Sequence, residues 1–439
     1  MKLGLDEILK ATGAVLLKGE ETTFLFSFST DTRTISCNDI YIPLKGENFD
    51  GENFIENALK SDAKGYFTSD KNKIYNKASY VFYVEETKEA YLKLAGFYKN
   101  KINPYTIAVT GSSGKTTVKE MMYCVFKNAG ETVKSVLNHN NEIGLCQTLS
   151  SINNSTKYLI VEMGMRAPGE IGLLSKYSCP DAAVIVNVGT AHIGRLGSLL
   201  NIAKAKFEIT QYLKPDGVLV AHENTLIKQI NDNKHKTIYF GLSDKNLKII
   251  EMTSNSSMFE YKGVKYKINA GGEHNIQNAL SVIETALYAG LDTNVIKKGL
   301  SEFLPIEKRW DMEEIKGFKI INDSYNANPD SVKAALKTFL LYTPSPKAVI
   351  LGDMGELGQE EEKYHREIGN FLDDFDCDFI ITTGELAKYI VTSKKKTKHF
   401  DNKTDIVKYI EKELPEGCNI LLKASRFMKF EEIIEGLRK

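Results

Sequence analysis

The sequence predicts an α/β protein of three domains, and three observations support this prediction. A chain of 439 residues is too long for a single ordinary core and favours two or three domains. Short apolar runs alternate with helical patterns over most of the chain, as in parallel sheets that are covered by helices. Polar segments around Pro104 and Pro305 interrupt this alternation, which gives predicted domains at residues 1–102, 103–307 and 308–439.

The composition argues against several classes of protein. Lys and Arg together number 57, as do Asp and Glu, and this balance supports neither nucleic acid nor a membrane surface as a partner. The six cysteines are scattered without a Cys-x-x-Cys pair, which argues against a zinc site or a disulfide framework. No apolar run approaches the length of a membrane span, and Asp6 and Glu7 lie where a signal peptide is apolar. We therefore expect a soluble, cytoplasmic protein.

Residues 1 to 100 are expected to form a small α/β domain with two polar, turn-rich loops. The expected strands are 40–44, 65–68 and 80–84, and the expected helices are 54–59 and 90–98. The two loops, Asp31–Thr34 and Gly46–Phe54, can bind a ligand or can equally be plain surface turns.

A strand, a glycine turn and a helix start follow one another from Tyr105 onward. Tyr105–Val109 is a β-branched and aromatic run, typical of a buried parallel strand. Gly111-Ser-Ser-Gly114 is a tight turn, after which Lys115 opens a helix that Gly130 is placed to end. One apolar face of this helix, at i, i+3, i+4 and i+7, consists of Val118, Met121, Met122 and Val125.

This arrangement predicts a phosphate-binding loop. Backbone N–H groups and the positive end of the helix dipole point at an anion in such a turn. Lys115 would reach the β- and γ-phosphates of a nucleotide, and the Thr116 hydroxyl would bind Mg²⁺. The pattern is shortened, because Val109 stands where a full P-loop has its first glycine. The alternative is a chance Gly-Lys-Thr in an ordinary turn; we interpret the chain as one that hydrolyses a nucleotide or transfers its phosphate.

Two further apolar runs place polar residues at strand ends. Residues 157–162 and 182–188 read as buried strands, and the carboxyl ends of parallel strands share one edge of a sheet. Glu162, Asn187 and His192 are therefore expected on the same edge as Lys115. Glu162 is either a Mg²⁺ ligand or a cap of a neighbouring helix, and His192 is either a metal ligand or a structural histidine.

Three stretches follow before the second boundary. Residues 202–209 read as a helix start whose lysines and Glu208 form a solvated face. Residues 257–268 read as a hairpin that turns at Lys262 and Gly263. A helix then begins near residue 275, and we expect His274, Asn275 and Asn278 in its first turn to cap it rather than to bind a ligand.

The last segment is predicted to be a small Rossmann-like domain. Its expected strands are 318–323, 347–352, 379–383 and 419–423, each followed by a helical stretch, with no Gly-x-Gly-x-x-Gly fingerprint. A polar loop, Ser324–Asp330, separates the first strand from a helix that starts at Ser331. Asp353, Glu356 and His365 follow the second strand and are either functional or merely solvated.

Taken together, these motifs resemble those of the Mur ligase family over essentially the whole chain. The matching stretches are Thr110–Thr117, Asn138–Gly144, Glu162–Ile171, Asn187–His192, Asp323–Ser331 and Leu351–Gly358. The most specific, around Asn326-Ala-Asn-Pro329, resembles the branch of the family that adds D-alanyl-D-alanine. The Asp-Asn-Pro-Arg motif of the branch that adds the third peptide residue is absent.

The resemblance implies a role for each matching residue. It implies that Thr116 and Glu162 bind the Mg²⁺ of ATP, that His192 binds a second Mg²⁺, and that Lys206 reacts with CO₂ to form a carbamate ligand. Lys115, Lys206, His192 and Arg309 would be catalytic. The implied nucleotide contacts are Gly111, Ser112, Ser113, Gly114, Lys115, Thr116, Thr117, Asn278 on the adenine side, Arg309 at the γ-phosphate and Asp323 at the ribose. The implied substrate contacts are Thr32, Arg33, Asp50, Gly51, Asn138, Asn326 and Asn328.

The implied activity is ATP-dependent amide ligation of D-alanyl-D-alanine to a UDP-N-acetylmuramoyl-tripeptide, through an acyl phosphate. The implied protein is a monomer that binds no nucleic acid and does not insert into a membrane. Asn322, Gly355, Ala424 and the stretch His222-Glu-Asn224 depart from the usual family pattern, and none of them belongs to the phosphate or metal set.

Two alternatives remain open. One is another ligase of the same superfamily, of the third-residue-adding or folylpolyglutamate type. The other is a nucleotide-dependent switch without ligation, although the guanine-reading Asn-Lys-x-Asp of GTPase switches is absent.

Overall fold

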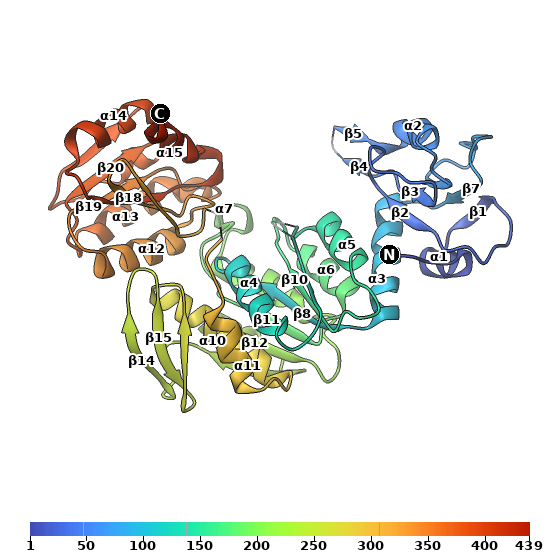
Figure 1. The fold of residues 1–439 in the computed structure, drawn as a ribbon, viewed down its shortest axis with the longest axis horizontal. Coiled ribbons are helices and arrows are strands. Elements are labelled where there is room, and N and C mark those ends of the chain that lie inside the picture. Colours follow the sequence, from blue (N-terminus) through green and yellow to red (C-terminus); the bar gives the residue numbers. More distant parts are fainter. Residues whose placement is uncertain (47, 137–138, 307) are drawn as a thin grey trace. The chain divides into compact units, whose positions relative to one another are not determined.

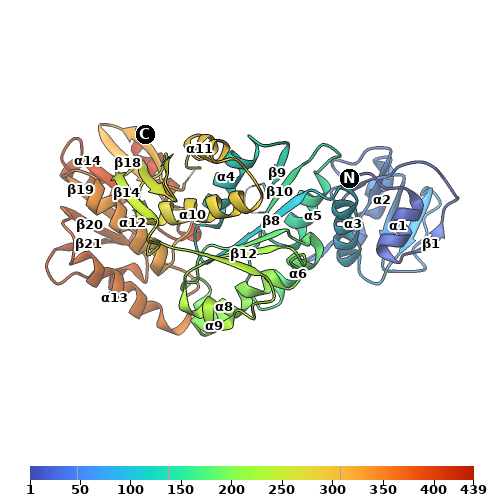
Figure 2. The same cartoon turned by 90° about the horizontal axis from the view of Figure 1, so that it is seen from below.

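The computed structural model describes residues 1–46, 48–136, 139–306 and 308–439, and it confirms the α/β class (Figure 1, Figure 2). The chain forms two compact units. The first comprises residues 1–108, 130–163 and 173–180, and the second comprises residues 109–129, 164–172 and 181–439. The predicted central domain is thus divided between the units, and the two predicted domain boundaries remain a prediction. Within the described residues, every helix is too short or too polar to cross a membrane.

The first unit contains a five-stranded sheet in the order β1-β7-β6-β3-β2. Its strands are β1 (Val15–Lys18), β2 (Ser27–Ser29), β3 (Asp39–Tyr41), β6 (Gly65–Thr68) and β7 (Tyr80–Tyr83), all parallel to their neighbours except β1. Helices α1 (Leu5–Thr12), α2 (Ile55–Lys60) and α3 (Thr87–Ile102) accompany it, and β4 (Lys45–Gly46) pairs with β5 (Phe49–Asp50). The strands form where apolar side chains are fully buried, among them Ile40, Phe67 and Phe82.

The first unit also holds the parallel strands β9 (Thr132–Lys134) and β10 (Tyr158–Glu162) and the helix α5 (Glu142–Ser150). Strand β8 (Tyr105–Thr110) begins in the first unit and ends in the second. Helix α6 (Glu170–Ser178) begins in the second unit and ends in the first.

The second unit begins with the helix α4 (Lys115–Phe126), whose apolar face is fully buried, as predicted. The parallel strands β11 (Ala182–Ile185), β12 (Val218–His222) and β13 (Lys236–Phe240) follow. Helices α7 (Ile193–Leu196), α8 (Leu199–Phe207), α9 (Thr225–Ile230), α10 (Glu273–Tyr288) and α11 (Thr293–Ser301) complete this part. A three-stranded antiparallel sheet consists of β14 (Leu247–Met252), β15 (Ser257–Tyr261) and β16 (Val264–Ile268), and it turns at Lys262 and Gly263 as predicted.

The last part of the second unit is a six-stranded sheet in the order β17-β18-β22-β19-β20-β21. Its strands are β17 (Asp311–Ile315), β18 (Phe318–Asn322), β19 (Lys347–Leu351), β20 (Phe379–Thr383), β21 (Thr397–Phe400) and β22 (Asn419–Lys423). Val349 and Leu351 pack into a core with α12 (Pro329–Tyr342) and α13 (Glu361–Leu372), whereas Ile350 packs into a core with α14 (Lys403–Glu413) and α15 (Glu431–Arg438). Both faces of the sheet are therefore covered, which explains why its strands are continuously apolar.

Several predicted boundaries shift for local reasons. Strand β3 stops at Tyr41, before Pro43, which cannot donate to a ladder. Helix α4 ends at Phe126, before Gly130. Helix α8 starts at Leu199 with Ser198 as its cap, so residues 202–207 are its later turns and not its start.

Candidate active site

The predicted phosphate loop has the backbone conformation that its glycines allow. Gly114 is the N-cap of α4 with φ 77°, and a Cβ there would lie 2.7 Å from the Asn278 side-chain oxygen. The Asn187 side-chain oxygen accepts hydrogen bonds from the N–H groups of Ser112 and Ser113, at 2.9 and 3.0 Å. Asn187 thus holds the turn in place from the end of the neighbouring strand.

The helix start behind this loop suits an anion. Helix α4 begins at Lys115, so the N–H groups of its first turn, which have no intrahelical acceptor, point into the loop. The Lys115 ammonium lies back over the turn and donates to the Gly111 carbonyl at 2.8 Å. The Thr116 hydroxyl is on a buried side chain in the same turn. Backbone donors, an ammonium and a hydroxyl are therefore gathered around one small loop.

Asn278 faces this loop, whereas the helix pattern without the family resemblance favoured a capping role. The N-cap of α10 is Gly272, and it makes no side-chain cap, so the capping prediction for His274, Asn275 and Asn278 is wrong. Asn275 and Asn278 are buried, and the Asn278 amide donates to the Asn275 oxygen at 3.3 Å. Burial lowers the pKa of His274 to about 4, so this residue is neutral at physiological pH.

Lys206 is a buried lysine of the second unit. It lies in the last turn of α8 with 1% exposure, whereas Lys204 is exposed, so the solvated face predicted for this stretch is wrong for Lys206. It makes no ion pair with any described residue. Burial and the charge of Lys115 hold the pKa of the Lys206 ammonium well below its usual value. Both causes favour the uncharged amine at this position relative to an exposed lysine.

Glu208, beside it in sequence, has a structural role. Its carboxylate accepts from the N–H groups of Gly169 and Gly172 at 2.7 and 3.1 Å. It thus satisfies backbone donors at the start of α6.

The loop that follows β11 contacts the last sheet domain. The His192 ring nitrogen Nδ1 lies 2.5 Å from the Glu356 carboxylate, and the Gly194 N–H donates to the Glu356 carbonyl at 3.1 Å. Asp330, at the start of α12, accepts from both the N–H and the hydroxyl of Thr190 at 2.7 and 2.8 Å. The hydrogen bond from His192 lowers the pKa of Glu356. Glu356 is therefore an exposed residue that is also a partner of a predicted metal ligand.

Asp353 and His365 shape the loop that carries Glu356. Both are buried, so the solvated interpretation is wrong for these two residues, unlike for Glu356. The Asp353 carboxylate accepts from the N–H groups of Leu386 and Ala387, at 3.0 and 2.7 Å. The His365 Nε2 accepts from the Met354 N–H at 3.0 Å, and burial lowers the pKa of His365. Their role in this structure is to fix the backbone of the loop.

Arg309 lies close to the loop Ser324–Asp330. The Cζ of its guanidinium lies 4.0 Å from the centroid of the Tyr325 ring, and this cation–π contact holds the side chain in place. Its buried Nε has no hydrogen-bond partner among the described residues. Asn326 is exposed, while Asn328 caps α12 by accepting from the Ser331 N–H at 2.9 Å.

Sequence reasoning missed two residues that hold this loop. Lys423, with 4% exposure, donates to the Asp323 carboxylate at 2.7 Å and to the Asp323 and Asn326 carbonyls at 3.0 and 2.8 Å. Ser425 donates to the Ala327 carbonyl at 3.2 Å and accepts from the Gly355 N–H. Lys423 is the last residue of β22 and Ser425 follows it, and these polar residues at a strand end were the available indication.

The other predicted residues belong to the first unit. Glu162 is buried at the end of β10 and accepts from the Asn140 amide at 3.2 Å. Asn138 lies outside the described residues. In the loop after β2, the exposed Arg33 pairs with Asp31 at 2.7 Å, which lowers the pKa of Asp31 to about 2, and Thr32 is half-buried between them.

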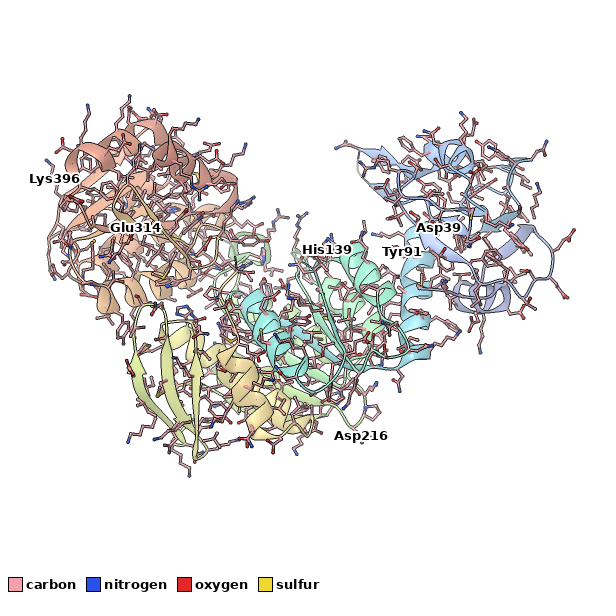
Figure 3. All side chains as sticks on the ribbon, in the orientation of Figure 1. Asp39, Tyr91, His139, Asp216, Glu314 and Lys396 are labelled. Atoms are coloured by element: carbon pink, nitrogen blue, oxygen red, sulfur yellow. The ribbon has the colours of Figure 1, made fainter. Side chains whose placement is uncertain are left out.

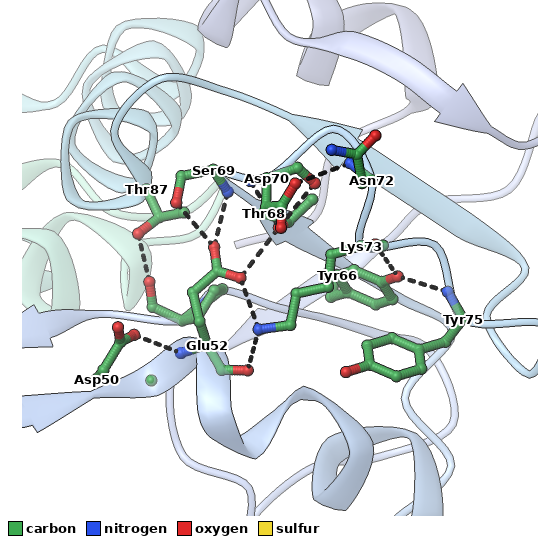
Figure 4. A network of polar contacts seen from close by, with 12 residues as sticks. Asp50, Glu52, Tyr66, Thr68, Ser69, Asp70, Asn72, Lys73, Tyr75 and Thr87 are labelled. Atoms are coloured by element: carbon green, nitrogen blue, oxygen red, sulfur yellow. Dashed lines mark hydrogen bonds and ion pairs between the residues drawn. The ribbon is translucent and has the colours of Figure 1, made fainter.

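The loop Phe49–Phe54 is held by a polar network (Figure 4). Asp50 accepts from the Glu52 N–H at 2.9 Å, and Gly51 is buried so closely that a Cβ would lie 2.6 Å from the Leu44 nitrogen. The Glu52 carboxylate accepts from the Thr68 hydroxyl and the Ser69 N–H at 3.0 and 2.7 Å, and it lies 3.3 Å from the Lys73 ammonium. Glu52 was not singled out from the sequence.

Family models and curated proteins both match this chain. Residues 109–286 match the Mur ligase middle domain, and residues 308–426 match the Mur ligase glutamate ligase domain. The UDP-N-acetylmuramoyl-tripeptide–D-alanyl-D-alanine ligase of Bacillus subtilis is 37% identical over 95% of this chain and 94% of its own length. The chain belongs to the Mur ligase family.

Other Mur ligases agree with this assignment. The Escherichia coli ligase of the same name is 30% identical, with 96% of each chain covered. A crystal structure of MurF from Acinetobacter baumannii superposes with a TM-score of 0.92 and 28% identity, covering all of this chain and 99% of that one. MurF from Thermotoga maritima in complex with ADP gives 0.85 and 26%, with 94% and 97% covered. A folylpolyglutamate synthase from Mycobacterium tuberculosis, at 14% identity, shares the fold alone.

The residues predicted as metal ligands suit Mg²⁺ only in part. The hydroxyl of Thr116 and the carboxylate of Glu162 are hard oxygen ligands, but an ammonium at Lys206 would repel a cation. Among the described residues, no group of three or more His, Cys, Asp or Glu side chains gathers around a common point. The set therefore fits Mg²⁺ once Lys206 carries an anionic oxygen group.

Proposed function

We propose that this Mur ligase is an ATP-dependent amide ligase that joins D-alanyl-D-alanine to UDP-N-acetylmuramoyl-tripeptide. The observation that carries this proposal is similarity over 95% of the chain to a ligase named for that reaction. The phosphate loop supports it independently of the name, because its backbone donors and the Lys115 ammonium suit phosphoryl transfer. MurF of Thermotoga maritima was solved with ADP, which supports ATP as the nucleotide of this chain.

The reaction has to activate a carboxylate, because an oxide ion is a very poor leaving group at neutral pH. A carboxylate oxygen of the tripeptide attacks the γ-phosphorus of ATP, the bond to the β-phosphate oxygen breaks, and ADP leaves. The dipeptide amine then attacks the carbonyl carbon of the acyl phosphate. Inorganic phosphate leaves, and the amine loses one proton to give the amide.

The cations of the second unit suit the first step. Lys115 is proposed to bind the β- and γ-phosphates together with the first-turn N–H groups of α4, and Arg309 is proposed to approach the γ-phosphate with its stacked guanidinium. Gly111, Ser112, Ser113, Gly114, Thr116 and Thr117 are proposed to surround the phosphates, with Asn278 on the adenine side and Asp323 at the ribose. Lys423 would act on the nucleotide only through Asp323, as a positioning residue.

Lys206 is proposed to carry a carbamate. The lowered pKa makes its amine available to attack the carbon of CO₂, forming an N–C bond and releasing one proton. Thr116, Glu162, His192 and this carbamate would hold two Mg²⁺ ions, which when bound supply positive charge next to the transferring phosphoryl group. His192 would bind a metal through Nε2 while its Nδ1–H donates to the Glu356 carboxylate, so Glu356 would orient the ring as a positioning residue.

The two polar loops of the first unit are proposed to recognise the UDP part of the substrate, with Thr32, Arg33, Asp50, Gly51 and Asn138 as contacts. Asn326 and Asn328 are proposed to serve the dipeptide. We further propose that the protein acts as a monomer in the cytoplasm.

A phosphate-release assay tests this proposal. We expect release from ATP only when both UDP-N-acetylmuramoyl-tripeptide and D-alanyl-D-alanine are present. Efficient use of meso-diaminopimelate or L-lysine with the corresponding dipeptide substrate, in place of D-alanyl-D-alanine, would identify the third-residue-adding reaction instead. ATP hydrolysis that is independent of both acceptors would support a nucleotide switch and refute the proposal.

A further inference from the structure

A lysine-lined groove lies in the second unit, between strand β16 and helix α11, and it has a volume of about 370 Å³. The strand contributes Lys265 and Lys267, and the helix contributes Lys297 and Lys298. Its lining contains no Asp or Glu. None of these residues belongs to the candidate active site, so the groove is a separate feature of the molecule.

The amphipathic patterns of both elements bring the lysines together. On β16, the exposed Lys265 and Lys267 alternate with the buried Tyr266 and Ile268. On α11, Ile296 and Leu300 are buried and the two lysines lie outside. The Asn269 amide donates to the carbonyls of Ser301 and Phe303, at 2.8 and 3.1 Å, and so ties the end of β16 to the end of α11. The walls of the groove are therefore fixed relative to each other.

The charges of the groove are poorly neutralised by the protein. Lys298 has Glu302 on its own helix, at 4.0 Å. Lys265, Lys267 and Lys297 make no ion pair with any described residue, although Glu260 stands opposite Lys265 in the strand register. Like charges held close together disfavour the empty groove and favour an anion that brings several negative charges.

The backbone of β16 adds further donors. The two-residue turn pairs Tyr261 with Val264, so Phe259–Tyr266 and Ser257–Ile268 are the next hydrogen-bonded pairs of the hairpin. The N–H groups of Lys265 and Lys267 consequently point away from β15. Because β16 is the edge of its sheet and three consecutive residues of it line the groove, the groove runs along this open edge.

We propose that this groove binds a small soluble anion with two or more phosphate groups. Ammonium and backbone N–H groups without a carboxylate among them suit phosphate oxygens. The volume is near the lower end of the range for ligand pockets, which suits a compact ligand. The ring of Tyr266, 2% exposed, leaves no aromatic surface on which a base could stack, so the groove reads the phosphates and not a nucleobase.

Calorimetric titration of the full chain with inorganic tripolyphosphate tests the proposal, with Lys115→Ala introduced into every chain compared so that the phosphate loop does not compete for the anion. We expect one equivalent to bind, more weakly as ionic strength rises. The double variant Lys265→Glu, Lys297→Glu should lower the affinity about tenfold or more, and the corresponding double Gln variant should lower it less. The matched control is Lys396→Glu with Lys412→Glu, two exposed lysines away from the groove (Figure 3 labels Lys396).

The same experiment can overturn the proposal in three ways. Equal affinity of the chains with and without the groove substitutions would do so, as would an equal loss in the control variant. Binding to phosphatidylglycerol vesicles without binding of tripolyphosphate would replace the soluble anion with a lipid surface. The titration involves no turnover, so its result does not depend on the proposed ligase activity, and the basal ligase rate should be unchanged when the groove substitutions are made in the chain that keeps Lys115.

Discussion

The Phe49–Phe54 loop of the first unit and the candidate site of the second unit differ in how their charged side chains are paired. Around Phe49–Phe54 the charged side chains pair with each other: Asp50 caps a helix, and Glu52 binds Lys73 and two polar neighbours. In the second unit, Lys206 is buried without an ion pair and the Arg309 Nε has no hydrogen-bond partner among the described residues. The charges of the first loop are thus paired within the protein, whereas Lys206 and the Arg309 Nε lack such partners among the described residues.

Replacing Lys206, the buried lysine without an ion pair among the described residues, should have the largest effect on activity. In the Lys206→Ala variant the proposed carbamate cannot form, and we expect the ligation rate to fall by about a hundredfold or more. Lys204→Ala, a change at an exposed lysine on the same helix, is the matched control and should be nearly neutral. Rates of both variants and of the wild type should be measured with and without added bicarbonate. Full activity of Lys206→Ala, or a bicarbonate response in that variant, would contradict the carbamate.

Lys423 offers the next largest effect, because it holds the loop that carries the proposed ribose and dipeptide residues. Lys423→Met would leave the Asp323 carboxylate and two carbonyls without their donor, at a cost of about 3 kcal/mol in unfolding free energy. We expect the KM values for ATP and for the dipeptide to rise about tenfold, with partial recovery in Lys423→Arg.

The control for Lys423 is Lys403→Met, which removes the more exposed pair with Glu432 and should cost at most about 1 kcal/mol. Chemical denaturation and steady-state kinetics measure both effects. A Lys423→Met variant with wild-type KM values would show that Lys423 serves stability alone.

The limits of sequence reasoning follow from these same residues. Glu162, Asn187 and the phosphate loop could be predicted because strand ends and glycine turns are local patterns. Lys204 and Lys206 look alike in sequence, yet residues two apart lie on opposite sides of a helix, and only one side of α8 is buried. The role of Lys423 is even harder to predict from the sequence, since its partners are the carboxylate and carbonyls of a loop a hundred residues earlier. Burial of a cation depends on tertiary partners, which no local pattern records.

A change at Glu52 tests the Phe49–Phe54 loop of the first unit. Glu52→Gln removes the charge that binds Lys73 and one of the two oxygens that accept from Thr68 and Ser69 (Figure 4). If the Phe49–Phe54 loop binds UDP, the KM for the UDP substrate should rise about three- to tenfold with kcat unchanged. Glu56→Gln, on the exposed side of α2, is the control. A fall in kcat without a change in KM would contradict a recognition role for this loop.

His365 should give the smallest effect, visible only as a pH dependence. Its folded pKa lies below the ordinary value of about 6.5, because it is buried and accepts from the Met354 N–H as a neutral ring. The unfolded chain therefore binds more protons below that pH, and the stability that His365 contributes is lost as the pH falls from neutral toward acid, by at most about 1.4 kcal/mol per pH unit. His365→Gln keeps an acceptor but cannot titrate, so the difference in unfolding free energy between wild type and variant should shrink on acidification. His399→Gln, at an exposed histidine, is the control, and equal pH profiles for wild type and His365→Gln would contradict this assignment.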